Sequence, residues 1–427
     1  MKTWARKSRP RGSRLSGPGR AVIIGPGKVG CGYLAPLFLD AGWRVVLVAR
    51  TPARVQRMQA AGAFQVRVVP GGESRTLTCA AVPFGGTSFR AAVAEADLLL
   101  TAVGVENVAG LGRALALALA SRPSSSPIDI WVVENADAAP VLQEAVRRAA
   151  CEAALTLPPV GFAGGLAYPI VAQGDWDAES MPVFVRDHDE RLVVDSSRLL
   201  GALPELPGVG VTREYGERLR EKLLIFGAGH ALCAYLGARC GYQRVDEAAT
   251  DPLLRTLVRQ FLLDARVAFE LVGFLRQDLL AAVDETIHRY ENEALEDSVR
   301  RVARSPIRKL APRGALVGAS KLVRRAFGAT SPPFALGIAS ALLYRDEADR
   351  QARELAAMLD RDGIGAVLLR VCGLEPADPL FKSVVVAYER MRASRDRMAV
   401  GCRGRGSVPR HAGIRAESPR ASEEALT

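Results

Sequence analysis

The chain has 427 residues, 49% of them hydrophobic and 24% charged, which is the composition of an ordinary globular protein with more than one domain. Its formal net charge of +11 is not evenly spread: residues 1–20 carry +7 and residues 395–427 carry +3, which leaves about +1 for the rest. Both ends have the composition of disordered tails. We therefore expect solvated basic tails and no nucleic-acid partner.

The cysteine, histidine and apolar content argues against a disulfide framework, a metal site and a membrane span. The seven cysteines form no CxxC pair and there are only four histidines, so we expect reduced thiols, a cytoplasmic protein and no metal site. The apolar segment 21–48 is interrupted by Lys28, Asp40 and Arg44. We therefore predict neither a transmembrane nor a targeting segment.

The first predicted elements form a strand, a glycine-rich turn, a helix and a second strand. An apolar run at 21–24 enters "GPGKVGCG", helical spacing follows in "YLAPLFLDAG", and "WRVVLVAR" is a second apolar run. Gly25, Gly27 and Gly30 match GxGxxG in the βαβ context that makes this pattern informative. We predict a dinucleotide site there, and the residues assigned to it in this turn are Gly25, Gly27, Lys28, Val29 and Gly30.

The end of the second strand indicates which cofactor binds. An acid at this point would bind the ribose 2′-OH of NAD, but the sequence has Arg50 and Thr51, with Arg54 nearby. An arginine can pair with a 2′-phosphate, so NADP(H) is favoured over NAD(H). The alternative is that Arg50 simply points into water.

Later apolar runs continue the sheet. Residues 96–104 and 128–135 read as buried strands, and 159–165 and 181–188 as further short ones. Val103 and Gly104, at the end of the first of these, are assigned to the cofactor site. The alternation of strands and helices predicts an α/β fold, with an N-terminal Rossmann dinucleotide-binding domain at 21–208 and a parallel sheet covered on both faces.

From residue 209 to 394 the pattern is mainly helical, with apolar residues at three- and four-residue steps. We expect this second domain to bind substrate and to carry the catalytic residues. Within it, "KLLIFGAGH" (222–230) allows three readings: a second nucleotide loop, a catalytic helix, or a core histidine with a surface lysine. The third glycine of a nucleotide loop is missing, and a regular helix would place Lys222 and His230 about 80° apart around its axis, where both can border one cleft. A nicotinamide-dependent enzyme must take or give the proton of an alcohol as hydride moves. A lysine can do this if burial brings its pKa toward neutrality.

Several long segments resemble mannitol-1-phosphate 5-dehydrogenases and related polyol-specific long-chain dehydrogenases. The similarity extends from about residue 21 to 394, and its motifs are "GPGKVGCGYLA", "TAVG", "VVEN", "EKLLIFGAGHALCAYLGARCGY", "GYQRVDEAATDP", "RYENEALEDSVRRVARSPIRKL" and "FALGIASALLY". The family has a Rossmann domain followed by a helical domain. It acts without metal on sugar alcohols or their phosphates.

The resemblance implies catalytic roles and also shows two departures. Lys222 matches the family's proton-transferring lysine, His230 its substrate-binding histidine and Asn135 an asparagine that polarises the reacting oxygen. The family's Lys-x4-Asn-x2-His motif has Gly227 in place of the asparagine, and Tyr168-Pro169 stand where an Asp-Arg pair is usual. Gly227 and Tyr168 are therefore expected at an altered substrate site.

The basic segment near residue 300 is the expected contact for a substrate phosphate. Arg289, Asn292, Arg308 and Lys309 belong to it; the other reading is a solvated basic face. The expected activity is an NAD(P)-dependent interconversion of a polyol or polyol phosphate with its ketose, and the interconversion of mannitol 1-phosphate and fructose 6-phosphate is one version of it. The alternative is a catalytically weak nucleotide-binding or regulatory homologue. The expected partners are small molecules, and the protein is expected to be a monomer or a small homo-oligomer without a membrane association.

Overall fold

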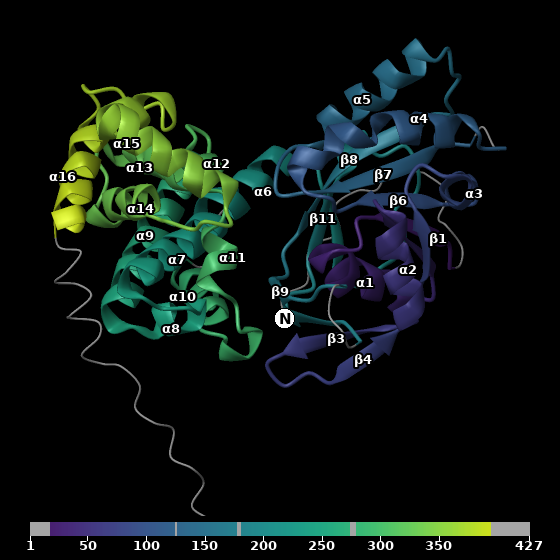
Figure 1. Ribbon diagram of the computed structural model, residues 1–427, viewed down its shortest axis with the longest axis horizontal. Helices are drawn as coiled ribbons and strands as arrows, with labels where there is room; N and C mark the ends of the chain where they lie inside the picture. The colour runs from purple at the N-terminus through teal and green to yellow at the C-terminus, as the bar shows by residue number, and fades with distance from the viewer. Residues whose placement is uncertain (1–17, 124–125, 177–180, 274–278, 394–427) are drawn as a thin grey trace, which may run out of the picture.

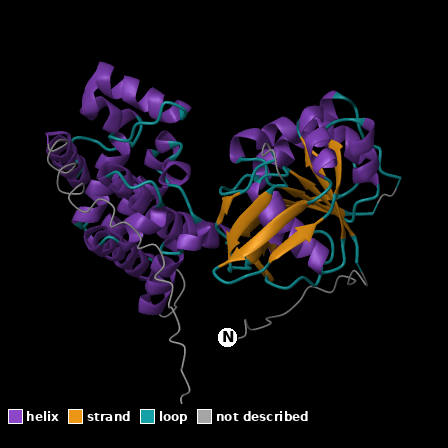
Figure 2. Ribbon diagram, turned by 60° about the horizontal axis from the view of Figure 1, so that its bottom comes forward, coloured by secondary structure: helices purple, strands orange, loops and turns teal. Residues whose placement is uncertain are grey.

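The computed structural model describes residues 18–123, 126–176, 181–273 and 279–393, which form two lobes (Figure 1). One lobe contains the sheets and the other is built from helices, as Figure 2 shows by colour. The tails expected at 1–20 and 395–427 lie outside the described residues, except for residues 18–20. The predicted class, a Rossmann-type α/β domain followed by a mainly helical domain, is confirmed.

The larger sheet is doubly wound around its first strand. Its neighbouring strands are parallel except for the antiparallel pair β8–β11. In spatial order the strands are β12 Val209–Thr212, β11 Leu192–Asp195, β8 Val160–Ala167, β7 Ile128–Val133, β6 Leu98–Thr101, β1 Arg20–Ile24, β2 Arg44–Ala49 and β5 Ala80–Pro83. The direction of winding reverses between β1 and β6. Such a switch point is where an α/β sheet binds its ligand.

A second, four-stranded sheet was not predicted. Its order is β4 Ser74–Leu77, β3 Phe64–Val69, β10 Val183–Asp187 and β9 Val171–Gln173, with β3–β10 parallel and the other two pairs antiparallel. Strands β3 and β4 are partly exposed, and a short strand that leaves many side chains in solvent lacks the continuous apolar run that marked the buried strands.

Helices cover both faces of the larger sheet. On one face α1 Ala35–Asp40 and α2 Pro52–Ala61 share a core with the small sheet. On the other, α3 Thr87–Ala94, the 3₁₀ segment η2 Val105–Leu111, α4 Gly112–Ala120 and α5 Ala139–Glu152 form a separate apolar layer. Strands β6 and β7 are buried along their whole length because both faces are covered.

The helical lobe has one core of its own, in which Phe261 and Phe334 stack with ring centroids 4.3 Å apart. The last sheet strand, β12, lies just beyond the expected boundary at residue 208. The helices that follow are α6 Tyr215–Glu221, η4 Lys222–Gly227, α7 Ala228–Cys240, α8 Val245–Thr250, α9 Pro252–Leu271, α10 Leu279–Tyr290, η5 Glu293–Leu295, α11 Val299–Ala303, α12 Pro306–Leu310, α13 Ala315–Phe327, α14 Pro332–Leu342, α15 Arg350–Arg370 and α16 Pro379–Ala393.

The continuous helix 215–240, made of α6, η4 and α7, joins the two lobes. Its first turns pack under β8 through Leu166, Tyr215 and Leu219, while α7 lies in the core of the helical lobe. This is the one helix among the described residues that is long and apolar enough to cross a membrane, but 61% of its apolar window is buried inside the protein. Helices at the centre of a protein core can be equally long and apolar, so the hydropathy of helix 215–240 is weak evidence for a membrane span.

Candidate active site

The glycine-rich turn after β1 has a separate steric reason for each glycine. Gly25 has φ +106°, and a Cβ on it would lie 2.3 Å from the carbonyl oxygen of Ala102 at the end of β6. A Cβ on Gly30 would lie 2.1 Å from the carbonyl oxygen of Gly25, whereas nothing described lies within 4 Å of a Cβ on Gly27. The turn is therefore closely packed on both sides of Gly27 and open at Gly27 itself, which fits a cradle for a pyrophosphate.

The helix that leaves this turn begins at Lys28 and Val29, and its hydrogen bonding starts from Gly27, whose carbonyl accepts from Cys31 N over 2.8 Å. The side chain of Lys28 donates to the carbonyl oxygen of Ala172. Burial, together with the nearby charge of Arg301, lowers the pKa of Lys28 to about 8. Lys28 is therefore within electrostatic reach of the helical domain.

Glu134 organises the loop after β6 and was missed by the sequence analysis. Its buried carboxylate accepts hydrogen bonds from Val103 N at 2.8 Å and from Gly104 N at 3.1 Å. Burial raises the pKa of Glu134 to about 7, although both amide donors oppose the shift. The two residues assigned to the cofactor thus give their amide hydrogens to a side chain. The available signal was an acid at the end of a buried strand, next to Asn135.

At the end of β2 the three residues considered for cofactor selection have different environments. Arg50 is exposed. Thr51 caps α2, with its Oγ1 accepting from Arg54 N at 3.4 Å. The guanidinium of Arg54 forms a 2.7 Å ion pair with Asp175, which follows β9. Of the two arginines, Arg54 is paired with Asp175 and Arg50 is not.

Lys222 lies where the two domains meet. Its Nζ donates to Asn135 Oδ1 at 2.8 Å and to the carbonyl oxygen of Ala167. Burial and the positive charge of Arg289 lower its pKa from 10.5 to about 7. The structure therefore brings together Lys222 and Asn135, two of the three residues predicted to be catalytic.

Tyr168 forms one wall beside the lysine. The Nζ of Lys222 lies 5.7 Å from the centroid of the Tyr168 ring, and the guanidinium of Arg191 lies 4.6 Å from the same centroid. A cation over the face of an aromatic ring is attracted by the negative charge of that face. Tyr168, which was predicted to lie at an altered substrate site, is thus in contact with the predicted proton-transferring lysine.

The helix carrying Lys222 is not regular, so the expected 80° offset from His230 is wrong. Residues Lys222–Gly227 form a π-helix, in which the backbone bonds run from residue i to i+5. Such bulges inside α-helices occur frequently at functional sites. Gly227 ends the bulge with ordinary helical angles, φ −65° and ψ −35°, and a Cβ on it would meet only the carbonyl oxygen of Lys222, at 3.3 Å. No steric requirement for glycine exists at residue 227.

His230 is buried and held on two sides. Its Nε2 lies 3.3 Å from Asp297 Oδ2, and its ring stacks on Tyr290 with centroids 4.7 Å apart and planes 5° apart. Asp297 is in turn paired with Arg301. Burial lowers the pKa of His230, opposed by Asp297, so the imidazole is neutral near pH 7. Lys222 and His230 share Arg289 as a neighbouring charge.

Arg289 and Asn292 connect the domains and have protein partners. The buried guanidinium of Arg289 pairs with Asp187 at 2.7 Å and Asp189 at 3.1 Å, and it donates to the carbonyl oxygen of Tyr168. Asn292 donates to the carbonyl oxygen of Val69 at 3.0 Å. A guanidinium engaged by two carboxylates has little to offer a phosphate, so the predicted phosphate contact for Arg289 does not fit its surroundings.

A group of cations surrounds the turn between α11 and α12. The side chain of Lys309 donates to the carbonyl oxygen of Arg304, and burial and the charges of Arg308 and Arg304 lower its pKa to about 7. Arg304 is also within electrostatic reach of Lys28 and of Glu106, which follows β6. Within the described residues none of Lys28, Arg304, Arg308 and Lys309 forms an ion pair with a carboxylate. Cations that lower a neighbour's pKa and form no ion pair with a carboxylate are typical of an anion site.

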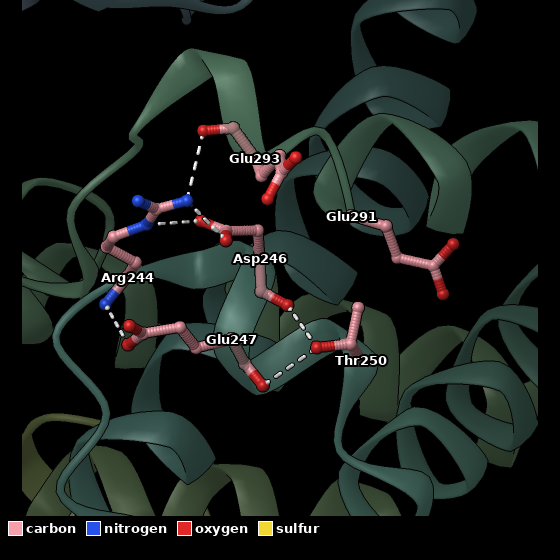
Figure 3. Close-up of a pocket in the computed structure, with 6 residues that line it drawn as sticks. All are labelled: Arg244, Asp246, Glu247, Thr250, Glu291 and Glu293. Carbon is pink, nitrogen blue, oxygen red and sulfur yellow. Dashed lines mark hydrogen bonds and ion pairs between the residues drawn. The ribbon is translucent and has the colours of Figure 1, made fainter. Parts of the chain in front are cut away.

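A well-defined opening elsewhere in the helical lobe is not part of this site (Figure 3). It has a volume of about 480 Å³, and its lining residues are Arg244, Asp246, Glu247, Thr250, Glu291 and Glu293. Figure 3 shows that Arg244 and its neighbours bond to one another around the start of α8. In the described ranges no group of three or more His, Cys, Asp or Glu side chains is arranged to hold a metal ion.

Both lobes match the domains of a known protein family. Residues 19–206 match the mannitol dehydrogenase Rossmann domain, and residues 214–392 match the mannitol dehydrogenase C-terminal domain. Mannitol-1-phosphate 5-dehydrogenase of Paenarthrobacter aurescens (strain TC1) is 29% identical over 385 residues, which cover 88% of this chain and 99% of the relative. The enzyme of the same name from Bacillus pumilus (strain SAFR-032) is 29% identical over 376 residues, covering 86% and 98%.

Solved structures agree with this fold. A ternary complex of mannitol 2-dehydrogenase from Pseudomonas fluorescens with NAD and D-mannitol superimposes with a TM-score of 0.71 at 18% identity, covering 90% of this chain and 94% of that one. A D-sorbitol dehydrogenase in substrate-free form gives a TM-score of 0.65 at 16% identity, covering 90% and 95%.

Proposed function

The chain belongs to the mannitol dehydrogenase family, and we propose that it is a nicotinamide-dependent oxidoreductase that interconverts a polyol or polyol phosphate and the corresponding ketose. The contact between Lys222 Nζ and Asn135 Oδ1 carries the proposal. It places an amine with a pKa of about 7 beside a side-chain amide, between a nucleotide-binding domain and a helical one. That pKa lies near the optimum for transferring a proton at neutral pH.

The proton chemistry follows from the surroundings of Lys222. A nicotinamide held by the glycine turn would supply the hydride acceptor for oxidation of a polyol, and the substrate's hydroxyl proton must leave as its C=O bond forms. A neutral Lys222 donates two hydrogens, to Asn135 and Ala167, and keeps its lone pair for that proton. In the reverse direction the ammonium form returns the proton to the oxygen of the ketose.

Asn135 and His230 bind the substrate around this lysine. Because Asn135 Oδ1 accepts from Lys222, the Nδ2 hydrogens remain to polarise the reacting oxygen. His230, neutral and donating Nε2–H to Asp297, presents Nδ1 as an acceptor for a substrate hydroxyl. Gly227 and Tyr168 line the altered part of the site, where the family carries an asparagine and an acid.

The glycine turn fits a dinucleotide, and we propose NADP(H) in preference to NAD(H). Exposed Arg50 at the end of β2 supports this choice, since a guanidinium pairs well with a 2′-phosphate. Lys28 and Val29 open the helix whose N-terminus favours the pyrophosphate charge.

If the substrate carries a phosphate, we propose that the cations at the α11–α12 turn bind it. Arg308 and Lys309 keep the role predicted for them, and Arg304 joins them, because none of the three forms an ion pair with a carboxylate among the described residues. Arg289 and Asn292 instead hold the two domains together. Arg304→Ala should then raise KM for a ketose phosphate and leave KM for the unphosphorylated ketose unchanged.

A second candidate is a homologue that binds the nucleotide and catalyses weakly. Gly227 favours it, because the missing side-chain donor is of a kind whose loss costs on the order of 10²–10³ in rate elsewhere. For either candidate we propose small-molecule ligands and a cytoplasmic protein that acts as a monomer or small homo-oligomer.

The deciding experiment is a screen of NADPH and NADH oxidation with ketoses and ketose phosphates, fructose 6-phosphate among them. Lys222→Ala should lower turnover on the order of 10²–10⁴-fold and leave cofactor affinity intact. Lys321→Ala is the matched control, because the Lys321 side chain also donates to a backbone carbonyl, that of Gly373, and is not one of the residues assigned to the site. Unchanged turnover in Lys222→Ala would remove this lysine from its role. Cofactor binding with no turnover on any ketose would favour the second candidate.

A further inference from the structure

Tyr290, at the end of α10, inserts its hydroxyl into the backbone of the helix that carries Lys222 and His230. The hydroxyl donates to the carbonyl oxygen of Phe226 at 2.5 Å, and the backbone N–H of His230 faces its oxygen. Tyr290 is 2% exposed, so water does not compete for these bonds. One side chain from another helix thus bridges two backbone groups four residues apart.

In a regular α-helix those two groups bond directly to each other, because the carbonyl of residue i accepts from the N–H of residue i+4. The insertion of a side chain into this ladder is a known cause of helix distortion. Here the distortion is the π-helix Lys222–Gly227, which ends one residue after the bridged carbonyl. The bulge therefore lies between the predicted proton-transferring lysine and the substrate-binding histidine.

Glycine at residue 229 permits this close approach. A Cβ there would lie 3.2 Å from the hydroxyl oxygen of Tyr290 and 2.6 Å from Leu262 Cδ2. The same tyrosine ring stacks on the imidazole of His230, with planes 5° apart. Tyr290 therefore contacts both the backbone and the side chain of His230.

We propose that Tyr290 is a positioning residue: its hydroxyl maintains the π-helix and so sets the rotation of Lys222 relative to His230. The inference rests on the proposed function, in which those two residues act on one substrate. Without the bridge, Phe226 and His230 can bond directly, the bulge closes and Lys222 turns away from Asn135. A misplacement of about 1 Å in such a site can cost on the order of 10²-fold in rate.

Tyr290→Phe tests this, because it keeps the stacked ring and removes only the hydroxyl. We expect kcat for ketose reduction to fall on the order of 10–10²-fold, with the Kd of the cofactor unchanged, because the glycine turn is in the other domain. Tyr235→Phe is the matched control. Tyr235 is fully buried on α7, and its hydroxyl donates to the carbonyl oxygen of Ala303 at 2.7 Å. Both variants should lower Tm by similar amounts, but only Tyr290→Phe should lower kcat.

Equal kcat values for Tyr290→Phe and Tyr235→Phe would overturn the inference and leave the proposed function standing. If Lys222→Ala is as active as the wild type, the proposed function fails instead. A crystal structure of Tyr290→Phe gives a readout that needs no activity: we expect α-helical bonding from Phe226 to His230. A retained π-helix at 222–227 would show that the hydroxyl does not maintain it.

Discussion

Lys222 Nζ donates a 2.8 Å hydrogen bond to Asn135 Oδ1, joining residues 87 positions apart that come from the helical and the nucleotide-binding domain. Neither domain alone contains this pair. The contact between the two lobes therefore brings the proposed proton-transferring group and its polar partner together. A change in the domain contact will alter the chemistry even where no substrate contact is changed.

Asn135→Ala should lower kcat for ketose reduction on the order of 10²–10³-fold, because the amide that polarises the reacting oxygen is lost together with a partner of Lys222. Since Asn135 is exposed, we expect little change in Tm. Steady-state kinetics measure kcat, and thermal unfolding of the same preparation measures Tm. A loss of less than about threefold in kcat would show that Asn135 has no part in the chemistry.

The pH dependence should have opposite signs in the two directions. Polyol oxidation needs the neutral amine, so its rate should rise as pH increases through about 7, the pKa of Lys222. Ketose reduction needs the ammonium form, so its rate should fall over the same interval. Asn135→Asp should move both midpoints upward, because a carboxylate beside Nζ stabilises the charged form. Midpoints that stay in place in this variant would identify a different titrating group.

Replacing each glycine of "GAG", Gly227 and Gly229, by alanine should change the stability of the protein differently. Gly229→Ala should destabilise the protein by about 1–3 kcal/mol, because its Cβ would lie 2.6 Å from Leu262 Cδ2. Gly227→Ala should be neutral or stabilising by up to about 1 kcal/mol, because residue 227 has helical angles and only one contact, at 3.3 Å. Denaturant unfolding of the pair measures the difference. Equal losses of stability would contradict this steric account.

Gly227→Asn restores the donor of the Lys-x4-Asn-x2-His motif, and the helical angles at residue 227 permit a side chain whose Cβ would lie 3.3 Å from the carbonyl oxygen of Lys222. We expect a gain in fructose 6-phosphate reduction relative to wild type, measured as kcat/KM, with Gly227→Ala as the control for added volume. No gain from the asparagine would mean that the surrounding pocket has been rebuilt for another substrate.

Arg50→Ala should weaken NADPH binding by about tenfold and leave NADH binding unchanged, since only NADPH offers a 2′-phosphate to this exposed guanidinium. Arg54→Ala should have a smaller effect, because Arg54 is already paired with Asp175 at 2.7 Å. Fluorescence titration of both cofactors against both variants gives the four constants. NADH binding tighter than NADPH in the wild type would refute the proposed preference.

Local patterns were enough to predict the nucleotide turn and the fold class. A GxGxxG turn between a strand and a helix has a geometry that follows from a segment of about thirty residues. The resemblance to the family added Lys222, His230 and Asn135, whose roles stay predictions. The small sheet escaped prediction because β3 and β4 are partly exposed and lack a continuous apolar run.

The sequence by itself determined that the chain has a nucleotide-binding domain and a helical domain, since these follow from periodicity and motif spacing, and its resemblance to a family indicated which lysine and histidine to examine. Only the tertiary structure decided what surrounds them. The carboxylates that occupy Arg289 lie about a hundred residues away in the chain. The pKa of Lys222 depends on burial between two lobes. Within the π-helix, the carbonyl oxygen of Phe226 accepts a hydrogen bond from a hydroxyl on another helix. Contacts between distant segments fix all three, and no local pattern around residue 222 contains them.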